Sequence, residues 1–174
     1  MKLTARARYA LRCMIQIGRM SKNGEPVSLA TVSKLTSISR RYLEQLAISL
    51  KNAELLKGVS GKGGGYMLAK PAEEIKIGEI FESAIGPINI VDCVKQPESC
   101  LITDICECRV IYMLINDRIT EVLNEFSLAD LLDVKRLSKL SGKKIGKSRI
   151  FESDLTQELT RRIRARGISP CATK

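Results

Sequence analysis

Histidine is absent from the 174 residues of this sequence. Without an imidazole, the chain lacks the general base of serine and cysteine hydrolases and the histidine ligands that catalytic zinc sites use. No other combination of acid, base and nucleophile stands out, so we do not expect an enzyme. Long apolar runs are also missing: none approaches the roughly 20 residues of a membrane helix, and arginines interrupt the apolar N-terminal stretch. We therefore expect a soluble cytoplasmic protein without a membrane partner.

Charge is unevenly distributed along the chain, whose length suits one domain with extensions. Lys and Arg total 29 against 19 Asp and Glu, a formal net charge of +10. Residues 1–70 hold 13 basic and 3 acidic side chains, residues 71–134 hold 4 and 13, and residues 135–174 hold 12 and 3. Basic ends around an acidic middle indicate that the ends contact a polyanion. Local motifs must decide whether that polyanion is nucleic acid.

Apolar periodicity predicts three helices in the first part of the chain. Over residues 3–21, apolar side chains recur at steps of three and four, as on one face of an amphipathic helix. Ser28 is placed to cap a second helix, and Ser39 is placed to cap a third. Because only residues 36–38 link the last two helices, these form a candidate helix-turn-helix.

A hairpin is predicted after these helices. Two short strands, at residues 55–60 and 65–68, are joined by the glycine-rich turn at 61–64. The turn is not a phosphate-binding loop, because Lys62 is not followed by Ser or Thr and no long strand precedes it. Three helices and then a hairpin is the order of a winged helix. We therefore predict a mainly α fold with a small β-hairpin wing, a winged helix-turn-helix DNA-binding domain over residues 1–85.

A long helix is predicted beyond this domain. Apolar residues recur with helical spacing from Glu107 to Phe126, and Ser127 can cap a short helix after it. The long helix is too apolar to stand alone in water, and a second copy of the chain is the simplest partner because symmetric dimers are the commonest oligomers. We assign residues 110–134 to a dimerisation helix with a short cap helix, and expect a homodimer. The alternative is that the long helix folds back on its own domain.

Two further segments complete the organisation. Residues 73–85 are rich in isoleucine and are predicted to pass from a strand into a helix that covers the core. Residues 135–174 are basic with few large apolar side chains, which predicts a flexible tail with a marginal helix around residues 154–166.

The start of the third helix carries side chains suited to reading DNA. In a helix-turn-helix this end of the helix enters the major groove. Arg40 and Arg41 can reach a phosphate or a guanine edge, and Glu44 can accept a hydrogen bond from a cytosine amino group. Lys62, between glycines at the wing tip, can follow the sugar-phosphate chain or enter a minor groove. A solvated helix face is the alternative, and the order of turn, helix and wing favours DNA. The candidate contacts are Ser39, Arg40, Arg41, Glu44, Gln45 and Lys62.

Four of the six cysteines lie close together within residues 86–109. Carboxylates outnumber the single lysine among their neighbours and disfavour free thiolates, whereas a bound cation relieves the repulsion. We predict a cluster-binding loop that holds an iron-sulfur group or zinc, and the spacing, unlike the paired short gaps of zinc fingers, favours iron-sulfur. Cys13 is expected in the core, and Cys171 is expected to be a free thiol. The candidate ligands are Cys93, Cys100, Cys106 and Cys108.

These features together resemble the Rrf-type family of bacterial winged-helix regulators. The segments MKLTARARYAL, YLEQL and GGGY, with three cysteines ahead of a long helix, carry the resemblance over residues 1–134. It implies a homodimer on palindromic double-stranded DNA, with the long helices crossing at the dimer interface. It also implies that an iron-sulfur cluster, [2Fe-2S] in preference to [4Fe-4S], controls DNA affinity. Cys93, Cys100 and Cys106 match the cysteine ligands of cluster-binding members, and Glu44 matches a base-reading glutamate.

The sequence departs from the family pattern at the fourth ligand and at the wing. Arg109 replaces a histidine that some members place three residues after the last cysteine ligand, and Arg8 replaces an aspartate that others take from the first helix. Cys108 is then the remaining candidate, which would make the site all-cysteine. Ser60 and Lys62 stand where iron-sulfur members carry Arg and Pro, so Ser60 joins the candidate DNA contacts and operator preference is expected to differ.

Two other functions fit the sequence. The chain could be a winged-helix repressor whose cysteines respond as thiols or bind zinc, in answer to cysteine metabolism or redox state. A basic RNA-binding or scaffold protein that uses its tail is the third hypothesis. Cluster-controlled DNA binding is favoured because it explains the charge blocks and the cysteine loop together.

Overall fold

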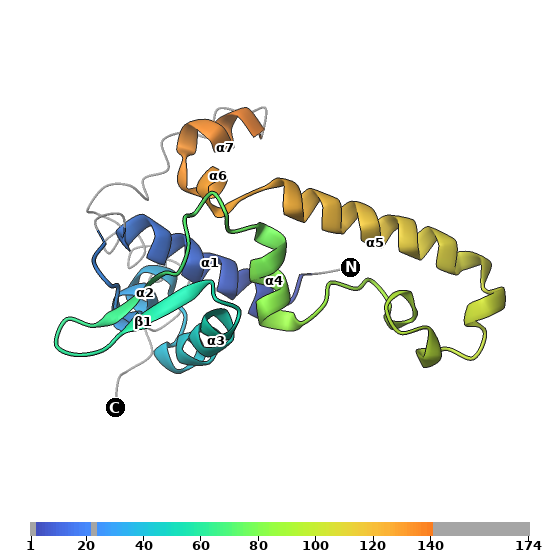
Figure 1. Cartoon of the computed structure of the whole chain (residues 1–174), viewed down its shortest axis with the longest axis horizontal. Coiled ribbons are helices and arrows are strands. Elements are labelled where there is room, and N and C mark those ends of the chain that lie inside the picture. Colours follow the sequence, from blue (N-terminus) through green and yellow to red (C-terminus); the bar gives the residue numbers. More distant parts are fainter. Residues whose placement is uncertain (1–2, 22–23, 141–174) are drawn as a thin grey trace, which may run out of the picture.

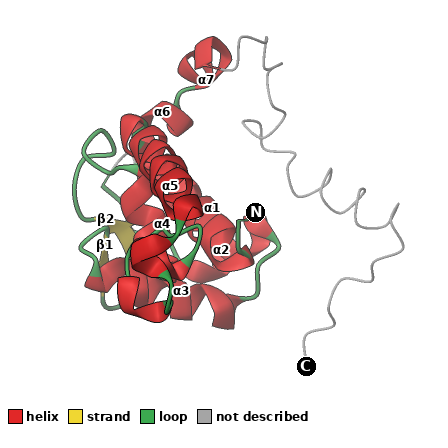
Figure 2. Cartoon of the chain, turned by 90° about the vertical axis from the view of Figure 1, so that its right-hand side faces the viewer, coloured by secondary structure: helices red, strands yellow, loops and turns green. Residues whose placement is uncertain are grey.

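A computed structural model describes residues 3–21 and 24–140 of the chain. These residues form a helical body from which one long helix projects (Figure 1). Figure 2 shows that the strands of the described residues belong to one small hairpin. The helices are α1 (Ala5–Met20), α2 (Leu29–Thr36), α3 (Arg40–Asn52), α4 (Ile77–Ile85), α5 (Glu107–Glu125), α6 (Leu128–Leu132) and α7 (Val134–Leu140). The strands are β1 (Leu56–Val59) and β2 (Gly65–Leu68), and the 3-10 helices between α4 and α5 are η2 (Asp92–Val94), η3 (Pro97–Ser99) and η4 (Thr103–Ile105).

Side-chain caps begin the first three helices. Thr4, Ser28 and Ser39 each accept a hydrogen bond from the backbone N–H three residues further on. Such caps satisfy one of the backbone donors that the first turn leaves unpaired. Ser37 ends α2 with a φ of 56°, in the left-handed region, and turns the chain towards α3. The starts predicted at Ser28 and Ser39 are thereby confirmed.

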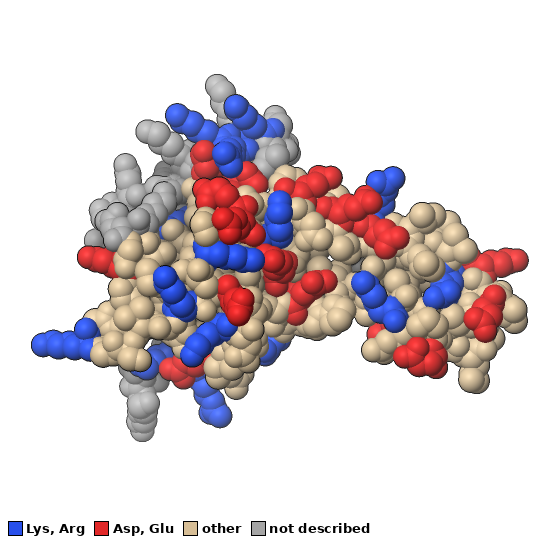
Figure 3. All heavy atoms as spheres, viewed as in Figure 1, with Lys and Arg blue, Asp and Glu red and all other residues tan. Residues whose placement is uncertain are grey.

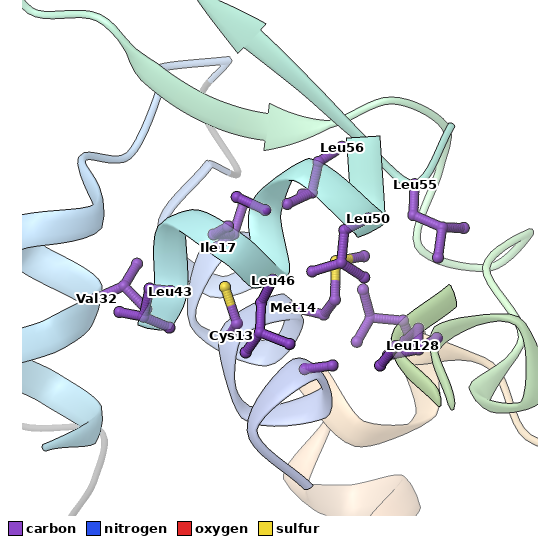
Figure 4. Packing of buried hydrophobic residues seen from close by; sticks show 14 of the residues in the cluster. Cys13, Met14, Ile17, Val32, Leu43, Leu46, Leu50, Leu55, Leu56 and Leu128 are labelled. Atoms are coloured by element: carbon purple, nitrogen blue, oxygen red, sulfur yellow. The ribbon is translucent and has the colours of Figure 1, made fainter. Parts of the chain in front are cut away.

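The core lies where α1 packs against α3 and α4. Figure 4 shows side chains of these helices meeting, with Met14, Leu46 and Leu50 fully buried. Cys13 is also fully buried, as predicted. Leu128, on α6, is buried in the same cluster, so the short cap helix packs on the body although the sequence groups it with the long helix. Each such side chain contributes roughly 1.5–3 kcal/mol on burial.

The hairpin is the predicted wing, with a shorter first strand. β1 and β2 are antiparallel, and Leu56 pairs with Leu68. Leu55 stays outside β1, because its N–H donates to Leu50 O (3.0 Å) and so completes the turn after α3. Val27 and Tyr66 exchange two backbone hydrogen bonds of 2.8 and 2.9 Å, which fasten the wing to the start of α2.

The remaining elements agree with part of the sequence prediction. The strand expected at the start of residues 73–85 is wrong: only an isolated bridge between Lys76 and Ser127 forms before α4 begins. The long helix from residue 107 is confirmed. α7 extends to Leu140 and so continues into the segment from residue 135 that was predicted to be flexible. The helix expected at 154–166 lies outside the described residues, as does Cys171. No helix within residues 3–21 and 24–140 is long and apolar enough to cross a membrane.

Candidate functional site

The start of α3 presents polar side chains to solvent. Ser39 caps the helix by accepting a hydrogen bond from the Tyr42 N–H (3.4 Å). The following residues Arg40, Arg41, Glu44 and Gln45 are exposed. On the face drawn in Figure 3, basic side chains lie on the wing, at the lower edge of the body and at the top of the molecule. Acidic side chains lie across the middle of the body, along α5 and, with some basic ones, at the cysteine-loop end. The sequence-predicted residues on α3 therefore share one accessible end of the helix.

Arg40 and Glu44 form an ion pair on this surface. Arg40 Nε lies 2.9 Å from Glu44 Oε1, and their side chains are 69% and 49% exposed. The pair lines a notch between the start of α2 and the wing, where Gly64 and Gly65 form the opposite wall. An exposed pair of this kind contributes at most about 1 kcal/mol. Glu44 can therefore exchange Arg40 for another hydrogen-bond donor at little cost.

The wing tip is a tight, exposed turn. Ser60 and Lys62 are both exposed there. Gly61 and Gly63 have φ values of 104° and 83°, a backbone region that favours glycine. At the wing base, a Cβ on Gly65 would lie 2.4 Å from the Val27 carbonyl oxygen, so this glycine allows the wing to approach the body. Lys62 is thereby carried at the end of a hairpin whose base is fixed.

The cysteine loop, residues 86–106, lies between α4 and α5 and contains the three 3-10 helices. Cys93 lies in η2, Cys100 follows η3 and Cys106 is the N-cap of α5; all three are half-buried. Cys108, one residue into α5, is exposed. Thiolates are suitable donors for an iron-sulfur group. In this conformation, however, no three Cys, Asp or Glu side chains among the described residues converge closely enough to hold a metal ion. The donor chemistry fits such a group, and the present arrangement of the loop does not.

Two side chains of α5 hold the beginning of the cysteine loop. Arg109 Nε donates to the Cys93 carbonyl oxygen (3.2 Å), and Asn116 Oδ1 accepts from the Ile90 N–H (3.3 Å). Asn116 is 1% exposed, although every other residue of α5 is half-buried or exposed. Sequence reasoning missed both roles. A polar residue within the apolar periodicity of residues 107–126 was the available signal for Asn116.

An apolar stripe along α5 is exposed. Its members recur at steps of three and four, and Ile111, Leu114 and Val122 are 55%, 56% and 49% exposed. Leu114, Ile119 and Leu123 belong to the walls of an apolar groove along this face. Contiguous exposed apolar surface of this kind marks an interaction site. The alternative fold, in which the long helix covers this face with its own domain, is not the one observed.

Comparison with known proteins identifies the family. The model of the Rrf2 family, described as "Iron-dependent Transcriptional regulator", matches residues 3–134. The chain belongs to the Rrf2 family. The regulator IscR of Pectobacterium atrosepticum is 36% identical over 137 residues, which cover 79% of this chain and 82% of that protein. This Rrf2 chain is thus a DNA-binding transcriptional regulator of the IscR type, and its relatives are regulators and not enzymes.

Two solved structures of regulators share the fold of this chain. The structure of CymR, the global cysteine regulator of B. subtilis, matches with a TM-score of 0.62 and 31% identity, over 76% of this chain and 96% of that chain. The structure of T. potens IscR matches with a TM-score of 0.63 and 24% identity, over 87% of this chain and 97% of that chain. The predicted winged helix is confirmed.

Proposed function

We propose that this Rrf2-family regulator binds palindromic double-stranded DNA as a homodimer, and that an iron-sulfur group in the cysteine loop controls its DNA affinity. The observation that carries the proposal is that α5 holds the cysteine loop and also presents the exposed apolar stripe. The exposed start of α3 and the wing lie on the body, whereas the loop that carries Cys93, Cys100 and Cys106 is attached to α5. A change in the loop therefore acts on the helix that presents the apolar face.

The DNA contacts follow from the exposed polar side chains. Arg41 is free to reach a phosphate, and Arg40 can do so when Glu44 turns to a cytosine amino group. Lys62 follows the backbone or enters the minor groove from the wing tip. The remaining proposed contacts are Ser39, Gln45 and Ser60. Because each neutralised phosphate releases counterions, DNA binding is expected to weaken steeply with salt.

The homodimer is proposed from the exposed stripe on α5. In a two-fold symmetric dimer the same stripe of each chain packs against the other. Leu114 and its neighbours, which are exposed in one chain, would then be buried in both copies. Burial of this stripe contributes about 25 cal/mol per Å² of apolar surface. The dimer would hold two α3 helices at a fixed separation, which is what recognition of a palindrome requires.

Cys93, Cys100 and Cys106 would hold the iron-sulfur group, with Cys108 as the proposed fourth ligand. When bound, such a group would react with oxidants, oxygen or nitric oxide, so that the conformation of the loop would depend on these signals. The loop must close to gather these thiols, because they do not converge in the described conformation. Arg109 and Asn116 keep the loop on α5 while it closes. A ligand that prefers one arrangement of loop and α5 shifts the population towards it, and DNA affinity follows.

Anaerobic purification of the full-length chain tests the cofactor proposal. We expect a brown protein with visible charge-transfer absorption, and iron and sulfide in a ratio that distinguishes [2Fe-2S] from [4Fe-4S]. A gel shift with the DNA upstream of the chain's own gene then compares the loaded and stripped protein. A colourless product with stoichiometric zinc would remove the iron-sulfur proposal and leave DNA binding in place.

A second candidate function is a regulator whose cysteines act as thiols or bind zinc. The similarity to CymR, the global cysteine regulator of B. subtilis, favours this candidate. Substitution of Cys93 or Cys106 by Ser distinguishes the two. If the metal content is unchanged and the response to oxidant is lost, the thiol function is supported. Loss of sequence-selective duplex binding on truncation after Asp133 would instead support an RNA-binding or scaffold role for the tail.

A further inference from the structure

Arg6 differs from the neighbouring arginines of α1. Arg8 and Arg12 are exposed, whereas Arg6 is half-buried. Its guanidinium contacts two other helices: Nε donates to the Ala84 carbonyl oxygen, and Nη2 donates to Ser49 Oγ at 3.0 Å. A single side chain therefore joins the end of α4 to α3.

The α4 contact lies at the root of the cysteine loop. Ala84 is in the last turn of α4, where carbonyl groups lack a donor within the helix. The Arg6 guanidinium supplies that donor, and its positive charge suits the C-terminal end of a helix. Gly86, with a φ of 81°, then turns the chain out of the helix, and Ile90 is bound to α5. Arg6 thus fixes the last turn of α4, directly before the cysteine loop begins.

α4 is also closely coupled to α5. The Asn124 side chain of α5 lies against Gly78 of α4, and the Ile77 N–H donates to the carbonyl oxygen of Phe126, the residue that ends α5 (3.1 Å). Packed helices of this kind move together, because interiors are dense and resist compression. A displacement of α5 that accompanies closure of the cysteine loop must therefore move α4.

The other arm of Arg6 ends on the recognition helix. Ser49 is half-buried on the same helix as Arg40 and Glu44. Leu46 and Leu50 hold α3 in the core by apolar contact, which is non-directional. The hydrogen bond from Arg6 is directional, so it sets the position of α3 along and about its axis.

We propose that Arg6 is a positioning residue that couples the cysteine loop to the recognition helix. Movement of the α4 end is carried through the planar guanidinium to Ser49, and so to the start of α3. In a dimer this changes the separation of the two recognition helices and hence the affinity for a palindrome. The inference rests on the proposed function, because it requires DNA affinity to depend on the state of the loop.

The test compares Arg6→Lys with Arg8→Lys in the full-length protein. Lysine keeps the positive charge, but its single ammonium cannot reproduce the two-armed planar contact. Dissociation constants for the DNA upstream of the chain's own gene are measured for the stripped protein and for the protein reconstituted with iron and sulfide. We expect Arg6→Lys to reduce the affinity ratio between the two states by about tenfold, the size of one charge-assisted hydrogen bond, and Arg8→Lys to leave this ratio unchanged.

Two further readouts separate coupling from direct DNA contact and from misfolding. The salt dependence of DNA binding should be the same in Arg6→Lys and wild type, because Arg6 touches protein groups rather than phosphate. In the stripped protein, Arg6→Lys should raise amide hydrogen exchange in the second half of α3 and at the end of α4. Ser49→Ala removes one arm only, and should also reduce the affinity ratio if Arg6→Lys proves unstable.

The outcomes are distinguishable. If wild-type protein binds DNA equally in both states, the proposed function is wrong and the coupling falls with it. Suppose that DNA affinity differs between the stripped and reconstituted wild-type protein, and that Arg6→Lys and Ser49→Ala show the same affinity ratio as wild type. The inference about Arg6 is then overturned, and the proposed function stands. A salt slope that falls by about one unit in Arg6→Lys would identify Arg6 as a phosphate contact and would also overturn it.

Discussion

Asn116 Oδ1 accepts a hydrogen bond from the Ile90 N–H at 3.3 Å, and this bond attaches the beginning of the cysteine loop to the middle of α5. We expect Asn116→Leu to lower the free energy of unfolding by about 1–3 kcal/mol, because a half-buried donor loses its acceptor. Amide exchange at residues 88–94 should rise. Chemical denaturation and hydrogen exchange measure these effects. The control is Asp117→Leu, at an exposed neighbouring position; an equal loss there would show that the effect is one of helix propensity.

The exposed apolar stripe of α5 should control the oligomeric state. Leu114→Glu places a charge at a side chain that is 56% exposed in one chain and would be buried between two. We expect a folded monomer with strongly reduced affinity for palindromic DNA and a lower melting temperature than the dimer, because association stabilises the native state. Sedimentation and a binding titration measure both. Asp117→Ala, at a residue that does not line the apolar groove, should remain dimeric, and a dimeric Leu114→Glu protein would place the interface elsewhere.

Glu44 and Lys62 should affect DNA binding in different ways. Glu44→Ala should relax the preference at one base pair by about 1–3 kcal/mol, because a base-specific hydrogen bond is lost. Lys62→Ala should weaken binding to all duplexes alike and reduce the salt slope by about one unit. Titrations with single-base operator variants at several salt concentrations separate the two effects. Unchanged base preference in Glu44→Ala would remove Glu44 from base readout.

The cysteines should differ in their reaction with alkylating reagents. Burial raises the pKa of the Cys13 thiol to about 12, so it remains protonated and inaccessible in the native protein. Cys108 is exposed. Treatment with iodoacetamide under native conditions should modify Cys108 and spare Cys13, and denaturation should make both reactive. Peptide mass spectrometry reads the result; rapid native labelling of Cys13 would mean that the core opens readily.

Asp130 should make stability depend on pH under acidic conditions. The pKa of this carboxyl is lowered from 3.8, first by the Ser127 N–H and then by the Ser127 hydroxyl, with a smaller contribution from Arg136. A lowered folded-state pKa gives stability that is present above pH 3.8 and is lost as the pH falls through the folded-state value. Denaturation at a series of acidic pH values should show a shallower decline in Asp130→Asn.

Local patterns were enough to predict much of the fold. The caps at Ser28 and Ser39 and the glycine turn at 61–64 depend on residues next to each other in the chain, and all are observed. The exposed stripe on α5 follows from the periodicity of one helix. The strand expected before α4 was predicted wrongly, because strand pairing does not depend on neighbouring residues alone. A strand at residues 73–76 would need a partner that is distant in the sequence, and Lys76 forms only one isolated bridge, to Ser127.

The residues of the candidate site could be predicted from the sequence, but their positions relative to one another could not. The sequence names Arg40, Arg41 and Glu44 as DNA contacts, and their exposure on α3 agrees with that role. It does not show that Arg40 and Glu44 pair with each other. It identifies the loop cysteines as possible ligands, but their convergence depends on the path of a loop without regular periodicity. That path is set by hydrogen bonds such as the one from Arg109 to Cys93.

The amino-acid sequence by itself determined the order of helices and wing, the charge of the two ends and the apolar face of α5, because each of these is written in neighbouring residues. Only the tertiary structure decided that Arg6 turns inward while Arg8 remains outside, and that Leu128 completes a core built mostly by earlier helices. Arg6 meets residues 43 and 78 positions away. Contacts over such separations arise from the packing of whole elements, which no periodicity within one element can specify.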